Sequence, residues 1–254
     1  MKERRIGIMG AMPEEIEGVV HLLTDRAETA AGRRTYYTGR INGIPAVVVF
    51  SRWGKVAAAT TVATLIHEFG ITDLIFTGVA GALQADLRIG DILIGTRLIQ
   101  HDMDVRPILP RFETPLLGIT WFESPRPWVD LSLKAVNELL DRRHLHEVIT
   151  EGELHLFRIT QPRVFTGAIA SGDKFFSRTD DKQQLQELLP EVLCVEMEGA
   201  AVAQVCYEYD IPFTIIRTVS DAADDASAID FPLFIQHISS RYSVEIIRNI
   251  FAHL

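Results

Sequence analysis

The sequence predicts a single three-layer α/β/α domain, in which helices cover both faces of a mixed central sheet. Short apolar runs alternate with longer segments of helical periodicity along the chain. No internal repeat, low-complexity tract or linker divides the 254 residues, so one domain is expected over 1–254. Hydrophobic residues make up 47% of the chain and charged residues 23%, a composition that can build a large core.

The N-terminal half begins with a buried strand, predicted by the apolar segment 4–11. Pro13 then suits the first turn of a helix, where Glu14 and Glu15 complement the helix dipole. The dipeptide Asn42-Gly43 predicts a tight turn between two strands. The further elements predicted in this half are the hairpin over 35–52, a helix over 55–70, a buried strand over 72–83 that ends in a glycine-rich turn, and strands over 89–105.

The C-terminal half resumes the alternation after a segment that resembles an insertion, 106–162, whose first part to 127 predicts a long loop. Asp230 is a suitable N-cap for a final helix that reaches Phe251. The other elements predicted are an amphipathic helix over 130–144, a strand over 162–173, a helix over 180–190, a short strand over 194–198, a helix over 199–210 and a last buried strand over 212–224.

Charge and composition exclude several classes of partner. The net charge of −9 would repel a phosphate backbone or an anionic membrane, so neither nucleic acid nor membrane is predicted as a partner. The only two cysteines, Cys194 and Cys206, are expected to fill the core rather than to form a disulfide. The N-terminal apolar run is too short for a signal peptide, and these features together predict a cytoplasmic protein.

Acidic residues follow several predicted strands, and ligands of such folds gather at the carboxyl ends of strands. The acids are Glu15, Glu198 and Asp221, with Glu14 or Glu196 as possible additions. Asp221 follows the apolar run "FTIIRTVS", so burial would raise its pKa and keep a proton for donation. Taken alone, Asp221 could equally cap a turn, and Glu15 would more often only stabilise a helix end.

The segment "VEMEGAA" places two glutamates among apolar residues, where a buried carboxylate needs compensation. In a strand, Glu196 and Glu198 share one face and Met197 points the other way. The first amides of the following helix could hold a carboxylate, which could then accept hydrogen bonds from a vicinal diol such as a ribose. Without other motifs, a capping role would be the better interpretation for Glu198.

Other motifs are absent. The glycine turn "TGVAGA" matches neither the P-loop nor the dinucleotide-binding pattern. The histidines at 101, 144, 146 and 155 lack metal-ligand spacing, so no metal is predicted. The serines at 51, 171 and 220 lack the G-x-S-x-G setting of a serine hydrolase.

Eight motifs in order, "GAMPEE", "GKVAAA", "TGVAGAL", "GDILI", "HDMDV", "ASGDKFF", "VEMEGAA" and "VSDAAD", resemble the 5′-methylthioadenosine/S-adenosylhomocysteine nucleosidases of the nucleoside phosphorylase superfamily. The resemblance covers the chain from Ile6 to the final helix except around 106–162. It implies a nucleoside phosphorylase-like fold, hydrolysis of the N-glycosidic bond of adenine thionucleosides, no cofactor and a homodimer.

The resemblance also implies roles for individual residues. Asp221 would protonate adenine N7 while Ser220 orients it, Glu15 would activate the attacking water, and Glu198 would bind the ribose hydroxyls. Met197 would lie beside the sugar, Glu196 would have a supporting role, and Arg217 would help to organise the water and the acids. Phe175 would stack on adenine, the Phe176 backbone would bond the edge of adenine, and Phe231 would cover the thioalkyl end. In a dimer, the loop 101–117 would lend Ile108 and Pro115 to the neighbour's thioalkyl pocket.

Three departures from the family pattern bear on the substrate. Val79 stands where some relatives carry serine near the ribose or water, and Arg52-Trp53 stand where relatives often show glycine and a small apolar residue. Segment 143–162 is longer than in compact relatives. The first two leave the exact substrate open.

Three alternative functions remain. A purine nucleoside phosphorylase would carry Arg and Ser for phosphate where this chain has Phe76 and Val79, and the carboxylates of Glu14 and Glu15 would repel phosphate. A non-catalytic purine-binding protein would be expected to lack one of the acids. Hydrolysis of 6-amino-6-deoxyfutalosine uses the same ribose-binding residues.

Overall fold

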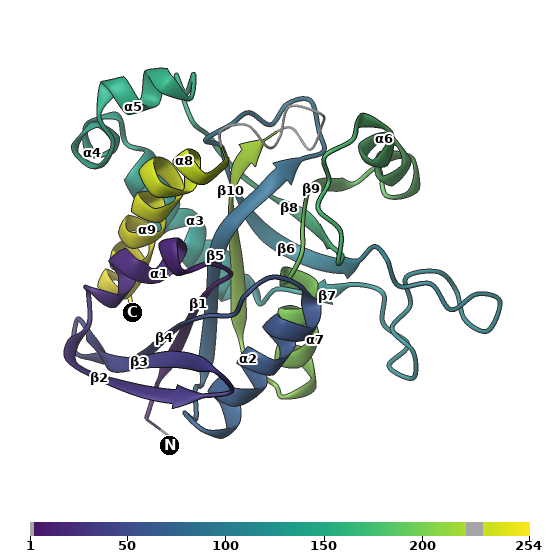
Figure 1. Cartoon of the computed structure of the whole chain (residues 1–254), viewed down its shortest axis with the longest axis horizontal. Coiled ribbons are helices and arrows are strands. Elements are labelled where there is room, and N and C mark those ends of the chain that lie inside the picture. Colours follow the sequence, from purple (N-terminus) through teal and green to yellow (C-terminus); the bar gives the residue numbers. More distant parts are fainter. Residues whose placement is uncertain (1–2, 222–230) are drawn as a thin grey trace.

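The computed structural model describes residues 3–221 and 231–254, and a mixed sheet of ten strands lies at its centre (Figure 1). The strands are β1 (Ile6–Gly10), β2 (Thr24–Ala31), β3 (Arg34–Ile41), β4 (Ile44–Phe50), β5 (Asp73–Ala82), β6 (Ile92–Gln100), β7 (Phe122–Glu123), β8 (Val164–Ser171), β9 (Val192–Glu196) and β10 (Phe213–Asp221). The helices are α1 (Pro13–Val20), α2 (Lys55–His67), α3 (Arg126–Leu140), α4 (Arg142–Val148), α5 (Glu151–Leu156), α6 (Thr179–Leu188), α7 (Gly199–Glu208), α8 (Phe231–Phe234), the π-helical turn η1 (Ile235–Ser239) and α9 (Ser240–Ala252).

The sheet closes on itself at one end. Strand β5 pairs in parallel with β1 and β10 and antiparallel with the end of β9, and β6 joins β10 to β8. Because β8 also pairs with β9, the strands β5, β10, β6, β8 and β9 form a ring, from which β1, β4, β3 and β2 extend. The mixed sheet confirms the predicted fold class, and the closure is a feature that the sequence did not predict.

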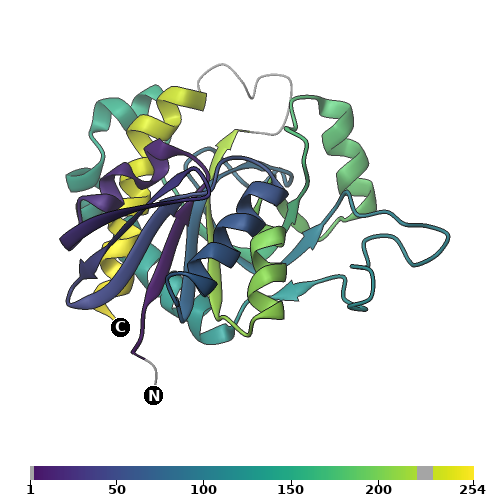
Figure 2. The same cartoon turned by 60° about the horizontal axis from the view of Figure 1, so that its bottom comes forward.

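Helices cover both faces of the sheet, as predicted (Figures 1 and 2). On one face, α1, α3 and α9 bury a cluster that includes Ile216, and on the other, α2 and α7 bury a cluster that includes Ile215. Neighbouring residues of β10 therefore enter opposite cores, which explains why the strand is buried along its whole length and shows no alternation of apolar with exposed polar residues. Both cysteines are buried and free, as predicted. No helix within 3–221 or 231–254 is long and apolar enough to cross a bilayer.

Most elements agree with the predictions, and the differences have physical causes. Asn42 and Gly43 adopt φ of 48° and 79°, which confirms the hairpin turn. Strand β2 was not predicted, because its side chains are nearly all exposed and it carries no apolar face. The helix expected over 130–144 is two helices, since the carboxylate of Asp141 accepts hydrogen bonds from the amides of Arg143 and His144 and starts α4 anew.

The segment predicted to be insertion-like is a loop followed by helices. The loop between β6 and β7 projects from the body of the molecule (Figures 1 and 2). The helices α4 and α5 lie near α9, where Glu153 binds both Arg241 and His237. The predicted cap Asp230 lies outside the described residues, and the final helical segment runs from Phe231 to Ala252 through a π-helical turn.

Candidate active site

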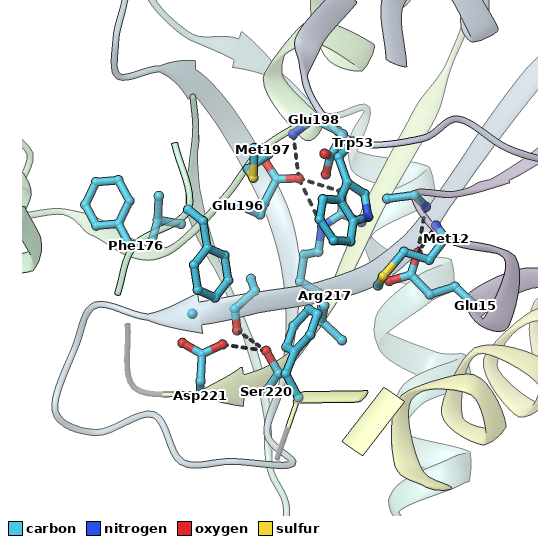
Figure 3. Close-up of a pocket in the computed structure, with 18 of the residues that line it drawn as sticks. Met12, Glu15, Trp53, Phe176, Glu196, Met197, Glu198, Arg217, Ser220 and Asp221 are labelled. Atoms are coloured by element: carbon cyan, nitrogen blue, oxygen red, sulfur yellow. Dashed lines mark hydrogen bonds and ion pairs between the residues drawn. The ribbon is translucent and has the colours of Figure 1, made fainter. Parts of the chain in front are cut away.

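Residues from five segments that follow predicted strands, "GAMPEE", "TGVAGA", "ASGDKFF", "VEME" and "VSDAAD", line a cavity of about 470 Å³ (Figure 3). Among the predicted site residues, those that line it are Glu15, Val79, Phe175, Phe176, Glu196, Met197, Glu198, Arg217, Ser220, Asp221 and Phe231. Ile108 is not among its lining residues and lies on the projecting loop with 84% of its surface exposed. The three proposed catalytic carboxylates, from α1, the start of α7 and the end of β10, thus share one cavity.

The carboxylate of Glu15 folds back onto the start of its own helix. Its Oε2 atom accepts hydrogen bonds from the amides of Ala11 at 2.6 Å and Met12 at 3.0 Å. Its Oε1 atom is buried without a hydrogen-bond partner in the described chain and faces β5, where a Cβ on Gly78 would come within 3.0 Å of it. Burial raises the pKa of Glu15 to about 7, against the opposing effects of the Arg217 charge and the backbone amides of Ala11, Met12 and Val79. This carboxyl can therefore change its protonation state near neutral pH.

Glu196 is the carboxylate that the helix amides hold, not Glu198 as the sequence suggested. Its oxygens accept hydrogen bonds from the amides of Glu198 and Gly199, and the Oγ of Ser171 donates to it. The guanidinium of Arg217 binds it through Nη2 at 2.7 Å and Nε at 3.2 Å. Both members of this ion pair are buried. Glu196 is thus fully partnered, and its charge is balanced before any ligand arrives.

The remaining donors of Arg217 are also engaged. Its Nη1 atom donates to the carbonyl oxygens of Phe76 and Ile216, and its guanidinium lies 4.0 Å from the centre of the Phe76 ring. Arg217 therefore holds β5, β9 and β10 together beneath the cavity. Sequence reasoning placed Arg217 in the site but did not identify its partner.

Glu198 differs from Glu196 in both position and surroundings. Strand β9 ends at Glu196, and Glu198 is the residue before α7, so the prediction that both side chains share a strand face is wrong. The Oε1 atom of Glu198 accepts a hydrogen bond from the amide of Gly54 at 2.7 Å. Its Oε2 atom has no hydrogen-bond partner within the described part of the chain. Burial and the neighbouring Glu196 raise its pKa. Glu198 is the carboxylate with capacity left for a ligand.

Asp221 ends β10, where Ser220 lies beside it. Relative to β5, the register shifts between Val219 and Asp221, so Ser220 is an extra residue in the strand. This irregularity lets two consecutive residues line the same cavity. The Oγ of Ser220 donates to Oδ2 of Asp221 at 2.7 Å, and both side chains are buried. The two residues are therefore in direct contact, and the orienting role of Ser220 stays a prediction.

Aromatic side chains form another wall of the cavity. Phe175 and Phe176 follow β8, and the ring of Phe175 contacts that of Phe231 edge-on at 6.1 Å between centroids. Trp53, from the turn before α2, also lines the cavity, although 64% of its surface is exposed. The sequence marked Trp53 as unusual without assigning it to the site.

No group of three or more His, Cys, Asp and Glu side chains within 3–221 and 231–254 is arranged to hold a metal ion. The buried His101 contacts the ring of Phe176, one of the lining residues, edge-on at 5.3 Å. The chemistry available at this site is therefore that of carboxylates, one balanced ion pair and aromatic surfaces.

Comparison with known proteins shows which proteins this chain resembles in sequence and fold. The family model of the phosphorylase superfamily matches residues 5–251. The 5′-methylthioadenosine/S-adenosylhomocysteine nucleosidase of Actinobacillus succinogenes is 34% identical over 251 residues, which cover 98% of this chain and 99% of the relative.

Two solved structures are similar over nearly the whole chain. The 5′-methylthioadenosine/S-adenosylhomocysteine nucleosidase of Neisseria meningitidis, in complex with methylthio-immucillin-A, has a TM-score of 0.86 and 31% identity, and the match covers 99% of this chain and 100% of that one. The futalosine hydrolase of Helicobacter pylori has a TM-score of 0.83 and 30% identity, with 99% and 98% covered.

Proposed function

Because the chain belongs to the phosphorylase superfamily and, within it, to the 5′-methylthioadenosine/S-adenosylhomocysteine nucleosidase family, we propose that it hydrolyses the N-glycosidic bond of adenine thionucleosides to adenine and a thioribose. The observation that carries the proposal is the meeting of Glu15, Glu198 and Asp221 in one cavity with an aromatic wall. Each carboxylate lies in a different environment, so each can take a different part in the reaction.

In the proposed reaction, Asp221 donates its proton to N7 of the adenine ring. The electron pair of the bond between C1′ and the base then leaves with the base, which departs as neutral adenine. Glu15 accepts a proton from water, and the hydroxyl forms the new bond to C1′. The unpartnered Oε1 atom of Glu15 supports this role, because it can accept a hydrogen bond from that water. Ser220 holds the carboxyl of Asp221 in place.

The sugar is proposed to lie between Glu198 and Met197. The free Oε2 atom of Glu198 would accept hydrogen bonds from the ribose hydroxyls, and its charge would stabilise the positive charge that develops on the sugar as the base departs. The Glu196–Arg217 ion pair helps to fix the position of Glu198, because the carboxylate of Glu196 accepts a hydrogen bond from the backbone amide of Glu198. Glu196 and Arg217 are therefore proposed as positioning residues.

The base and the 5′ substituent are proposed to contact the aromatic wall. Phe175 would stack on adenine, the backbone of Phe176 would bond the edge of the ring, and Phe231 would cover the thioalkyl group. Val79 lines the cavity beside Glu15 and offers the ribose an apolar contact in place of a hydroxyl. These roles follow the family pattern and are supported by the position of each residue in the cavity.

Hydrolysis is favoured over phosphorolysis because phosphate would need an unpaired cation. The basic residues that line the cavity are Arg217, which is bound to Glu196, and Lys174, which is bound to Asp181 at 2.8 Å. The carboxylate of Glu15 would repel phosphate at the position proposed for the nucleophile. A second substrate, 6-amino-6-deoxyfutalosine, is supported by the similarity to the Helicobacter pylori futalosine hydrolase.

We further propose a cytoplasmic homodimer that acts in methionine salvage. The projecting loop carries exposed apolar side chains, among them Ile108 and the fully exposed Leu116. In a dimer this loop would bring Ile108 and Pro115 to the thioalkyl side of the neighbour's cavity. Light scattering together with the activity assay tests the dimer: a monomer with full activity would contradict it.

The reaction is tested by release of free base. The protein is incubated with methylthioadenosine, adenosylhomocysteine, 6-amino-6-deoxyfutalosine and inosine, each with and without phosphate. We expect adenine from the first two substrates at a rate that does not depend on phosphate. Release that begins only when phosphate is added would replace hydrolysis by phosphorolysis, and release from the futalosine compound alone would change the substrate.

A further inference from the structure

The motif "HDMDV" (101–105) has no part in the proposed reaction. None of its residues is among the described residues that line the cavity. Its first two side chains are nevertheless engaged. His101 is buried, and the carboxylate of Asp102 accepts hydrogen bonds from two separate segments of the chain. Both segments belong to the proposed active site.

The sheet places Asp102 against the segment 172–176, which carries two rings of the aromatic wall. Strands β6 and β8 pair in parallel, and Gln100 at the end of one lies beside Ser171 at the end of the other. The residues that follow the two strands therefore meet at one edge of the sheet. There, the Oδ2 atom of Asp102 accepts a hydrogen bond from the amide of Asp173 at 3.0 Å. Asp102 thus fixes the backbone near the start of the segment.

His101 packs against the same segment. Its ring contacts the ring of Phe176 edge-on, and its backbone amide donates to the carbonyl oxygen of Ser171 at 3.0 Å. A Cβ on Gly172 would overlap the Nε2 atom of His101, so only a glycine lets the segment lie this close. The two side chains of the motif together fix the position of the segment.

The other oxygen of Asp102 binds the turn that holds Glu198. Its Oδ1 atom accepts a hydrogen bond from Nζ of Lys55 at 2.6 Å. Gly54, the residue before Lys55, donates its amide to Glu198. Because Lys55 is the first residue of α2, the bond to its side chain fixes the start of the helix and the adjacent amide. Asp102 therefore acts on Glu198 through Lys55 and Gly54.

A third contact joins the two segments directly. The Oδ1 atom of Asp173 accepts a hydrogen bond from the amide of Lys55 at 2.8 Å. A Cβ on Gly54 would come within 3.0 Å of that same atom, so the turn lies close against the segment. Asp102, Lys55 and Asp173 thus form a closed set of three contacts, in which each residue binds the other two.

We propose that Asp102 is a positioning residue that couples the binding of adenine to the binding of the ribose. The proposal rests on the proposed function, in which the segment 172–176 binds adenine and Glu198 binds the ribose. Adenine on the segment fixes Asp173, which holds Lys55 and, next to it, the Gly54 amide that orients Glu198. Asp102 keeps these parts together and touches neither half of the substrate. By linkage, each half should bind more tightly when the other is present.

The test measures this cooperativity directly. Calorimetry gives the Kd of adenine with and without saturating 5-methylthioribose, the sugar product of the proposed reaction, and the same proteins are assayed for adenine release. The variants are Asp102→Ala, Asp102→Asn, which keeps an acceptor for only one of the two donors, and Lys55→Met, which keeps the amide that binds Asp173. The side chain of Asp102 is 34% exposed, so its replacement is expected to leave the fold intact, and thermal unfolding checks this.

The control is Asp130→Ala, which removes a carboxylate from an exposed ion pair with Arg126 on α3. In the wild type, methylthioribose should lower the Kd of adenine roughly tenfold, a usual size for coupling between two sites. Asp102→Ala and Lys55→Met should remove most of this factor and lower kcat/KM for methylthioadenosine by a similar one. Asp102→Asn should lie between them and the wild type, and Asp130→Ala should match the wild type.

A wild-type protein without this cooperativity would overturn the proposal. So would an Asp102→Ala protein that keeps it, even where kcat/KM falls, because a merely structural role would lower the rate without changing the coupling. If the wild-type protein releases no adenine from methylthioadenosine, the proposed function fails instead.

Discussion

Replacing Glu15 by glutamine should stabilise the protein and abolish most of its activity. Burial raises the pKa of Glu15 from 4.5 to about 7, which means that the fold disfavours the ionised carboxylate. The proposed reaction needs that same ionised form to accept a proton from water. Stability and activity should therefore depend on pH in opposite directions through one side chain.

The size of the stability effect follows from the pKa. Below pH 4.5 the carboxyl is protonated in both the folded and the unfolded protein, so it contributes nothing. Between pH 4.5 and about 7 only the unfolded protein ionises, so stability falls as pH rises and levels off above pH 7. Each pKa unit is worth about 1.4 kcal/mol, so the cost at pH 8 is about 3 kcal/mol.

Glutamine keeps an acceptor for the amides of Ala11 and Met12, although a neutral acceptor binds them less strongly. We therefore expect Glu15→Gln to be about 2 kcal/mol more stable than the wild type at pH 8, with a melting temperature roughly 4–8 °C higher. At pH 4 the difference should vanish or reverse. Comparing the two proteins at each pH cancels the contribution of titrating groups that do not interact with Glu15; Glu198, whose pKa the charge of Glu15 raises, is an exception.

The assays are thermal unfolding of both proteins from pH 4 to pH 8 and adenine release over the same range. Wild-type kcat/KM should rise with pH around an apparent pKa of about 7, and the variant should be roughly 100-fold or more slower. A variant that is less stable than the wild type at pH 8 would refute the argument from burial. A variant with near wild-type turnover would remove Glu15 from the reaction.

Three further substitutions test other parts of the site. Asp221→Asn should slow adenine release by roughly 100-fold or more while an analogue still binds, because the amide has no transferable proton; unchanged turnover would contradict this. Arg217→Leu should lower the free energy of unfolding by about 3–5 kcal/mol in a denaturant titration, since it leaves Glu196 buried and unpaired; a loss below about 1 kcal/mol would contradict this. Gly54→Ala should lower kcat/KM roughly 10-fold, because an alanine at φ 91° would shift the backbone amide that donates a hydrogen bond to Glu198. The control Gly118→Ala, at φ 65° with open space around its Cβ, should lower stability only.

The sequence predicted the elements that are buried on both faces and missed those that are not. The run "PFTIIRTV" is apolar on both faces because Ile215 and Ile216 enter different cores, and runs of this kind predicted the central strands. The edge strand β2 is exposed along nearly its whole length, so no periodicity distinguishes it from a loop. Closure of the sheet depends on two residue pairs between β5 and β9, which leave no local signal.

The sequence predicted which acids lie at the site, but it assigned to Glu198 the hydrogen bonds from helix amides that Glu196 accepts. Because the strand ends at Glu196 rather than at Glu198, the amides at the start of α7 bind the carboxylate of Glu196. The exact end of a strand is not determined by the local sequence pattern. The partner of Glu196 lies 21 residues along the chain, so only the tertiary structure could identify it. Trp53 enters the cavity from a turn whose position is likewise set by the packing of distant strands.

The distribution of charge among the buried acids distinguishes structural from functional carboxylates in this cavity. Glu196 takes the full guanidinium of Arg217, two backbone amides and a serine hydroxyl, so its burial is compensated within the protein. Glu15 and Glu198 are as deeply buried, yet each keeps one oxygen that no described residue binds, and burial raises the pKa of both. A fold selected for stability alone would not leave two such carboxylates without full compensation in one cavity. Their missing partners are groups that the proposed reaction supplies, a water for Glu15 and a ribose for Glu198.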